Sequence, residues 1–375
     1  MKSMVYALDT LPLESLLAPV AKATEVLARL DERLARSPVR DGFVERQNFA
    51  DAAAALWLEG ELVHLEDLVL HDGHMDARAP THELPRAHAV LRARRQVLAQ
   101  SPDWALSREG LRELTGRGRA ASMEAGVGRE GQGTATSTDE ADVWDDAEDE
   151  ILAEEFAEID AVLARSSKIL SGADMPAKTP RSNERPDLIY DLDWDEDARL
   201  AEWQDVIDST RELPGVLRAA ILLDAWSTIE VLQHAAWLGP LLVAALLRQE
   251  GVAAVHLACL HLGAKNIPRE RRRARTRSDR LLAFVDAIQE AAMAGLKEHD
   301  RLMLAKNQME RRLRGRRASS KLADLVELVL SRPIVSTGMI QDRLRVSKQG
   351  ALNLVGELSL REMTGRGRFR AWGVL

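Results

Sequence analysis

Three side chains near the end of the sequence have the chemistry needed to read DNA. Lys348, Gln349 and Asn353 lie within six residues and directly follow Ser347. Glutamine and asparagine amides form paired hydrogen bonds with adenine, and the lysine ammonium group binds guanine or phosphate. We therefore predict that Ser347, Lys348, Gln349 and Asn353 contact double-stranded DNA.

Two short helices would have to position these residues. Ser336 or Thr337 can cap a helix that carries Ile340 and Leu344 on one face, and Ser347 can cap a second helix after a short turn. The apolar positions of the second helix are Ala351, Leu354, Val355 and Leu358. This pattern predicts a helix-turn-helix whose second helix enters a major groove, and a homodimer is the usual state of such regulators.

Basic residues follow the second helix in the segment TGRGRFRAW, which is typical of a turn and a strand. Arg366, Arg368 and Arg370 alternate there with Phe369 and Trp372. We predict a winged helix-turn-helix whose arginines follow the DNA backbone or a minor groove. Winged helices also bind proteins, so an interaction module remains the alternative.

The charge of the chain is unevenly distributed along the sequence. The whole chain has a net charge of -8, whereas residues 265–375 hold 25 Lys and Arg against 12 Asp and Glu, a net of +13. Residues 1–264 therefore carry -21. Two arginine clusters, 265–280 and 310–321, could bind phosphates. The accessory contacts that we predict are Arg271, Arg272, Arg273, Arg316 and Arg317. For the first cluster, a solvated helix surface paired with the acidic half of the chain is an equal alternative.

One segment is strongly acidic. Residues 139–160 contain 12 acidic residues and no basic ones, interleaved with a thin apolar stripe. We expect an acidic helix here. Our hypothesis is that it folds back over the arginine clusters and competes with DNA.

Helical periodicity dominates the sequence before the predicted wing, and 46% hydrophobic residues are enough for a sizeable core. The fold class that we predict is mainly α, with a multi-helix body and a C-terminal winged helix-turn-helix. The predicted divisions are an N-terminal helical region (1–114), a Gly-rich and acidic linker with one acidic helix (115–190), a central helical domain (191–315) and the DNA-binding domain (316–375).

The single cysteine and the lack of membrane signals indicate a cytoplasmic protein. Cys259 lies in an apolar run, where a buried and inert thiol is expected, and one cysteine cannot form an internal disulfide. The sequence begins without a signal-peptide pattern. Its longest uncharged stretch, 231–247, is interrupted by polar residues and a Gly-Pro pair, so no membrane partner is expected.

Residues 64–88 are rich in histidines and carboxylates, the side chains that bind zinc. The spacing argues against a metal site, because HELPRAH places its second histidine six positions after the first instead of four. We expect capping and hydrogen-bonding roles for this segment, with no metal and no cofactor. Phosphate-binding, dinucleotide-binding and nucleophile-elbow motifs are missing too, so we name no catalytic residue and expect no enzyme.

Several segments resemble an alphaproteobacterial family that is carried in many copies on rhizobial chromosomes and plasmids. They are residues 40–96, the segment WLGPLLVAALL, the segment HLACLHLGAKNIPRERRR and the terminal domain. The family pairs a helical domain of unknown function with a C-terminal helix-turn-helix. The resemblance implies the same layout here, and it is weakest over 115–190.

The order of parts also resembles Fic-type proteins, which transfer nucleotide-derived groups onto protein hydroxyls. Leu58-Glu59-Gly60, Leu65-Glu66 and residues 237–251 occupy comparable places. The Fic signature of His-Pro-Phe and Gly-Asn-Gly-Arg is missing from the corresponding stretch, 227–242. The likeness thus implies a catalytically silent core in which His234 is structural. The alternative function is an interaction scaffold that uses the winged helix and the acidic helix to bind proteins.

Overall fold

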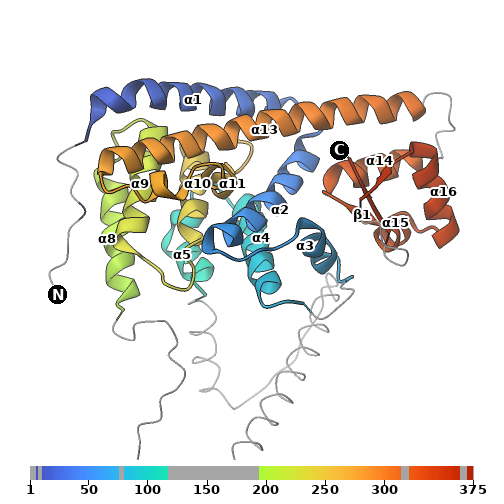
Figure 1. Ribbon diagram of the computed structural model, residues 1–375, viewed down its shortest axis with the longest axis horizontal. Coiled ribbons are helices and arrows are strands. Elements are labelled where there is room, and N and C mark those ends of the chain that lie inside the picture. The colour runs from blue at the N-terminus through green and yellow to red at the C-terminus, as the bar shows by residue number, and fades with distance from the viewer. Residues whose placement is uncertain are drawn as a thin grey trace, which may run out of the picture. The chain divides into compact units, whose positions relative to one another are not determined.

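The computed structural model describes residues 6, 11–75, 80–116, 194–313, 321–363 and 370–374. Within these ranges the chain is mainly α-helical and ends in a small helical domain with three short strands (Figure 1). The predicted fold class, mainly α with a C-terminal helix-turn-helix, is confirmed. The predicted acidic helix at 139–160 and nearly all of the linker lie outside the described residues.

The first group of helices covers the N-terminal third of the chain. Its elements are α1 (Leu13–Ala35), α2 (Arg40–Glu59), α3 (Leu65–Asp72), α4 (Glu83–Ala99), the 3-10 turn η1 (Trp104–Leu106) and α5 (Arg108–Leu114). Helix α2 ends where Gly60 adopts φ 93°, a left-handed conformation that glycine tolerates. The Ser107 hydroxyl accepts a hydrogen bond from the backbone N–H of Gly110 and so caps α5.

A second group of helices covers residues 196–313. Its elements are α8 (Glu196–Ser209), α9 (Gly215–Ile229), α10 (Leu238–Gln249), α11 (Leu260–Lys265), α12 (Arg269–Arg272) and α13 (Arg277–Leu313). Helix α9 is buried along nearly its whole length, which explains its almost continuous apolar sequence. It ends at Glu230, which adopts φ 52°.

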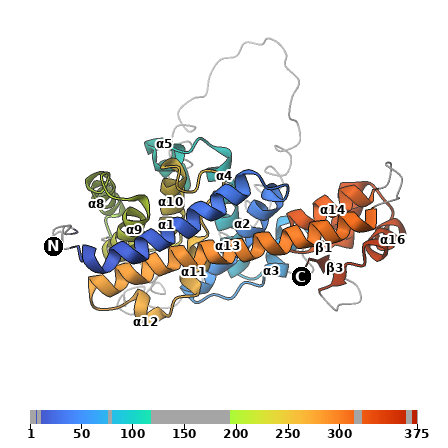
Figure 2. The same ribbon diagram turned by 90° about the horizontal axis from the view of Figure 1, so that it is seen from above.

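The longest helix, α13, runs alongside α1 (Figures 1 and 2). Leu30 of α1 packs on Gly295 of α13, where an added Cβ would lie 2.6 Å from a Leu30 methyl group. One turn further along both helices, Arg33 forms an ion pair with Asp300 at 3.0 Å. The two helices are therefore parallel. The 37 residues of α13 span about 55 Å at 1.5 Å per residue.

The C-terminal domain combines three helices with a small sheet. Its elements are α14 (Leu322–Ser331), β1 (Val335–Ser336), α15 (Thr337–Leu344), α16 (Lys348–Leu358), β2 (Arg361–Glu362) and β3 (Ala371–Gly373). The antiparallel sheet has the order β1-β3-β2, with Trp372 opposite Val335 on one side and Glu362 on the other. Trp372 is 2% exposed, so the central strand joins the sheet to the core.

Within the described ranges, residues 11–116 and 194–374 belong to one compact unit. The C-terminal domain therefore packs on the helices that precede it. None of the helices in this part of the chain has the length and apolar character needed to cross a membrane.

Candidate nucleic-acid interface

Helices α15 and α16 form the predicted helix-turn-helix with the predicted caps. The Ser336 hydroxyl accepts a hydrogen bond from the N–H of Met339, and the Ser347 hydroxyl accepts one from the N–H of Gly350. Between the helices, Arg345 adopts φ 53° and ends α15. The buried face of α16 consists of Ala351, Val355 and Leu358. Three of the four predicted apolar positions are thus buried, while Leu354 is half-buried.

The opposite face of α16 is exposed and polar. Lys348, Gln349 and Asn353 are all exposed, and the Nε2 of Gln349 donates a hydrogen bond to the Oδ1 of Asn353 at 3.0 Å. This bond is local, since the two residues are one helical turn apart. The two amides therefore form a pair on the surface of α16, and the structure brings these predicted residues together.

The predicted wing is described only at its base. Arg370 lies beside β3 and forms an ion pair with Glu362 of β2 at 2.6 Å, and its guanidinium lies 5.4 Å from the centre of the Trp372 ring. Arg370 therefore has an intramolecular partner that its sequence pattern did not indicate. Arg366 and Arg368 lie outside the described residues, as do Arg316 and Arg317.

The first arginine cluster has mixed environments. Arg271 forms an ion pair with Asp286 at 2.7 Å, and the Nε of Arg272 donates to the carbonyl of Ile267. Arg273 is exposed. Burial lowers the pKa of Arg272, and the neighbouring charges of Arg273 and Arg269 lower it further. Of the three predicted accessory contacts in this cluster, Arg271 and Arg273 are exposed, and Arg271 is paired with Asp286.

A cluster of charges joins the C-terminal domain to the preceding helices. Asp72, at the end of α3, accepts hydrogen bonds from Arg95 at 2.5 and 2.9 Å and from Arg332 at 3.0 Å. The Nε2 of His88 lies 3.2 Å from the same carboxylate. Burial alone would raise the pKa of Asp72, but the His88 and Arg95 hydrogen bonds and the arginine charges hold it well below its ordinary value. Asp72 is therefore ionised, and its carboxylate contacts the side chains of Arg95, Arg332 and His88.

A second arginine also contacts the end of α14. The guanidinium of Arg46, on α2, donates to the carbonyls of Val329 and Arg332 and pairs with Glu298 of α13 at 3.0 Å. Helices α2 and α14 also approach closely, because an added Cβ at Gly42 would lie 2.8 Å from the carbonyl oxygen of Leu330. We call the contacts of Asp72 and Arg46 with residues 329–332 the docking clamp. They fix the C-terminal domain on the helical body.

The histidine-rich segment contributes to this clamp. His88 contacts Asp72, and the His71 and His88 rings meet edge to face at 5.0 Å, while His64, His74 and His82 are exposed. In the described part of the chain, no three His, Cys, Asp or Glu side chains gather where they could hold a metal ion. His88 has the hydrogen-bonding role expected for this segment, whereas His64 and His82, at the starts of α3 and α4, form no side-chain cap. Asp72 is the most connected member of the segment.

A fully buried ionic network lies in the body. Asp51 accepts hydrogen bonds from Arg94 at 2.6 Å and from the N–H of Leu262 at 2.9 Å, and its Oδ2 lies 2.8 Å from the Nδ1 of His261. Burial alone would raise the pKa of Asp51, but the charges of Arg94 and His261 lower it. The network links α2, α4 and α11. His234, in contrast, is half-exposed and lies 3.0 Å from Glu196.

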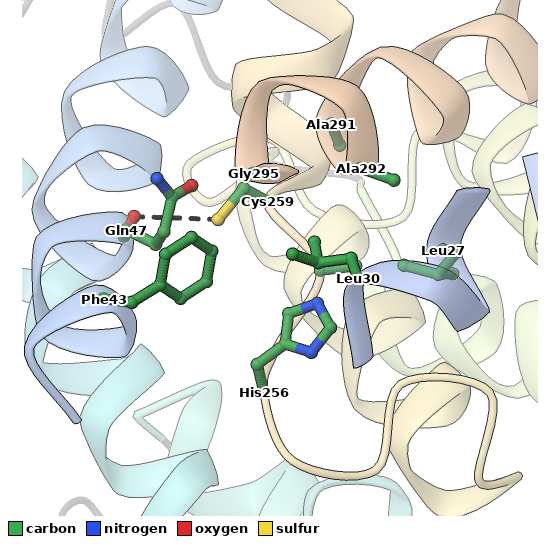
Figure 3. A pocket seen from close by; sticks show the side chains of 10 residues that line it. Leu27, Leu30, Phe43, Gln47, His256, Cys259, Ala291, Ala292 and Gly295 are labelled. Atoms are coloured by element: carbon green, nitrogen blue, oxygen red, sulfur yellow. Dashed lines mark hydrogen bonds between the residues drawn. The ribbon is translucent and has the colours of Figure 1, made fainter. Parts of the chain in front are cut away.

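Cys259 lines a small pocket beside this network. In Figure 3 its thiol points toward the backbone carbonyl of Gln47, the Sγ–O distance being 3.7 Å, and Phe43 and Leu30 line the same pocket. Burial raises the pKa of this thiol to about 12. Such a thiol is protonated at neutral pH and is a poor nucleophile.

Together these features define a mainly α-helical protein with a C-terminal helix-turn-helix domain. Residues 322–375 match a family model described as "HTH DNA binding domain", and residues 188–314 match one described as "Protein of unknown function (DUF1612)". The chain is 50% identical over 380 residues to the Uncharacterized protein y4cF of Sinorhizobium fredii (strain NBRC 101917 / NGR234), covering 99% of this chain and 100% of that protein. The chain belongs to the family of this rhizobial protein, which confirms the resemblance seen in the sequence.

The residues of the docking clamp were not predicted from the sequence. Arg46, Asp72 and Arg332 come from segments that are far apart in the chain. Asp51 in α2, which precedes the apolar run AAAALWL, carried a weak signal for the buried network, whereas Arg94 lies between Arg92 and Arg95 and carried none. A charged residue at a buried helix position requires a partner, although the sequence does not say which one.

Proposed function

We propose that this protein is a transcriptional regulator that reads double-stranded DNA through α16. The observation that supports this most is the exposed amide pair of Gln349 and Asn353, which follows Ser347 and Lys348 on a helix whose other face is buried. The domain match to a DNA-binding helix-turn-helix agrees with it. The proposal assigns DNA binding and no catalytic step to the chain.

The amide pair has the hydrogen-bonding groups needed to recognise adenine. Because the Nε2 of Gln349 donates to the Oδ1 of Asn353, the Oε1 of Gln349 and the Nδ2 of Asn353 remain available on the exposed face. An acceptor beside a donor complements the N6 amino group and the N7 atom of adenine in the major groove. Lys348, in the first turn, would contact a phosphate or a guanine.

The hairpin of β2 and β3 would act as a wing next to α16. Arg370 is held against Glu362 and Trp372 at its base. The contacts of Arg366 and Arg368 with the DNA backbone or minor groove remain a prediction from the sequence. A homodimer would place two such domains on symmetric half-sites.

The test is selection of bound genomic fragments by the purified full-length protein at two salt concentrations. A regulator enriches a defined motif that persists at the higher salt, and a palindrome would report a dimer through its half-site spacing. Binding without a motif that disappears with salt would reduce the interaction to nonspecific electrostatics. That result would favour the catalytically silent, Fic-like interaction scaffold.

Two substitutions separate the roles of the α16 side chains. Gln349→Ala should relax the base preference at one position of the motif, at a cost of about 1–3 kcal/mol for the preferred base. Lys348→Ala should weaken binding to all sequences in a salt-dependent way. Gln308→Ala and Lys297→Ala are matched controls, because both residues are exposed on α13, and both variants should bind like the wild type.

A further inference from the structure

Three exposed arginines lie in α12 and in the segment between α12 and α13. Arg269, Arg273 and Arg275 are exposed and form no ion pair with any residue in the described ranges. We call these three residues the α12 arginine surface. Asp286 pairs with Arg271 and Asp224 with Arg280, while Glu270 and Asp279 offset part of the local charge. Residues 269–280 hold seven arginines against these two carboxylates. The surface therefore keeps a local excess of positive charge.

The arginines of this region are also crowded. The charges of Arg273 and Arg269 act on Arg272, whose pKa is lowered first by burial and then by these like charges. Clustered like charges repel one another, and an anion that neutralises them relieves this repulsion. A surface of this kind attracts the phosphates of a nucleic-acid backbone.

The α12 arginine surface is far from the amide pair of α16. The Arg271–Asp286 ion pair holds α12 on the first turns of α13, and Arg312, at the other end of α13, donates to the carbonyl of Leu358 in α16. From Asp286 to Arg312 the helix rises about 40 Å, at 1.5 Å per residue. One turn of DNA measures about 34 Å. Any duplex that contacts both ends of α13 must therefore span more than one turn.

We propose that the α12 arginine surface is a second DNA-contact site, which binds the phosphate backbone of the same duplex more than one turn away from α16. This inference rests on the proposed function of α16. It implies that the protein contacts a long stretch of DNA, and that the DNA flanking the bases read by α16 contributes affinity whatever its sequence. Helix α13 separates the two sites by a fixed distance.

The experiment compares full-length wild-type protein with the triple variant Arg269→Ala/Arg273→Ala/Arg275→Ala on two DNA probes. One probe is a 10-bp duplex closed as a hairpin, about 34 Å long and too short to reach both sites. The other is a 40-bp duplex that contains the same 10 bp. The control variant Arg92→Ala/Arg108→Ala/Arg112→Ala removes the same charge from exposed positions on α4 and α5. Fluorescence anisotropy at several salt concentrations gives the affinities, and thermal denaturation verifies folding.

On the 40-bp probe, the slope of log K against log salt should fall by about 2 to 3 in the triple variant, because each lost phosphate contact contributes about 0.9. On the 10-bp probe the triple variant should bind like the wild type, and the control should bind like the wild type on both probes. Equal binding of the triple variant and the wild type on the 40-bp probe would overturn the inference. An equal loss on both probes would also overturn it, because the contact would then lie close to α16.

The proposed function is tested separately by the same probes. If the wild type binds neither probe, the assignment of DNA binding to α16 fails, and the second site fails with it. If the wild type binds and Gln349→Ala relaxes base preference while the triple variant is unchanged, the inference about the α12 arginine surface fails alone.

Discussion

The Nη1 of Arg332 lies 3.0 Å from the Oδ2 of Asp72, although 260 residues separate them in the chain. Arg332 follows α14 in the C-terminal domain, and Asp72 ends α3 in the N-terminal region. This ion pair therefore connects the domain that carries the helix-turn-helix to the first helices of the protein. Arg95 holds the same carboxylate through two hydrogen bonds.

Asp72→Asn should destabilise the protein by about 1.5–3 kcal/mol, because it removes the carboxylate charge that accepts hydrogen bonds from Arg95 and Arg332. Urea denaturation measures this as a lower midpoint. Asp67→Asn is the matched control, since Asp67 lies on the same helix and is exposed, and such a change should cost under about 0.5 kcal/mol. Equal midpoints for the two variants would mean that Asp72 contributes no stability.

The contribution of Asp72 should persist to acidic pH. Its folded-state pKa is lowered, so the stability it adds is fully present above the unfolded pKa of about 3.9 and is lost as the pH falls through the folded value. The difference in unfolding free energy between wild type and Asp72→Asn should therefore be constant from about pH 8 to pH 5 and shrink below about pH 4. A difference that already shrank near pH 6 would contradict this prediction.

Arg94→Met should strongly destabilise the helical body. It leaves the fully buried Asp51 without its closest cationic partner, a change that costs about 3–5 kcal/mol in comparable buried pairs. Arg94→Lys should cost less, because it keeps the charge but loses the planar fork that also reaches Asn48. Thermal denaturation should rank these variants below Arg92→Ala, an exposed change on the same helix. Equal melting temperatures for Arg94→Met and Arg92→Ala would contradict the prediction.

Gly356→Ala should raise stability and weaken DNA binding. Gly356 is exposed near the C-terminal end of α16, and no atom lies within 4 Å of an added Cβ. Alanine therefore fits, and it should stabilise the helix by about 0.5–1 kcal/mol. The position is one turn past Asn353, so the new methyl group would meet DNA bound along this face. Thermal denaturation and binding to the 40-bp probe measure the two effects. A stabilised variant with unchanged affinity would place DNA away from this half of α16.

Cys259 should react slowly with a thiol reagent in the folded protein. Burial raises its pKa to about 12, so little thiolate is present at pH 8, and its Sγ faces the carbonyl of Gln47. The reaction with an aromatic disulfide, followed by absorbance, should become fast on addition of denaturant. Fast modification under native conditions would show that this pocket opens readily.

Local sequence signals were sufficient to locate the two helices of the helix-turn-helix. Ser336 and Ser347 cap the two helices predicted there, and Gly60 ends α2 in the left-handed conformation. These features depend on a few neighbouring residues, and a side-chain cap or a left-handed glycine has the same effect in many folds. The exposed polar face of α16 followed from the same local pattern.

Pairs that form across the fold could not be predicted in this way. The partner of Asp72 depends on how the C-terminal domain packs on the preceding helices. Any of several arginines could form an ion pair with an aspartate, and the sequence does not select one. Strand β1 was also missed, because two residues are too short to show an alternating pattern. Arg370 was predicted to contact DNA, and its ion pair with Glu362 arises only when β2 and β3 come together.

The docking clamp has an entropic consequence for any ligand of α16. A recognition domain that rotates independently of its body loses that rotational freedom when it binds, and this loss reduces affinity. Here Arg46 and Asp72 already hold residues 329–332, so folding has removed this freedom in advance. The C-terminal domain should therefore tumble in solution at the rate of the whole compact unit. A ligand that broke the contacts of the docking clamp would lower the affinity of α16 for DNA without contacting α16.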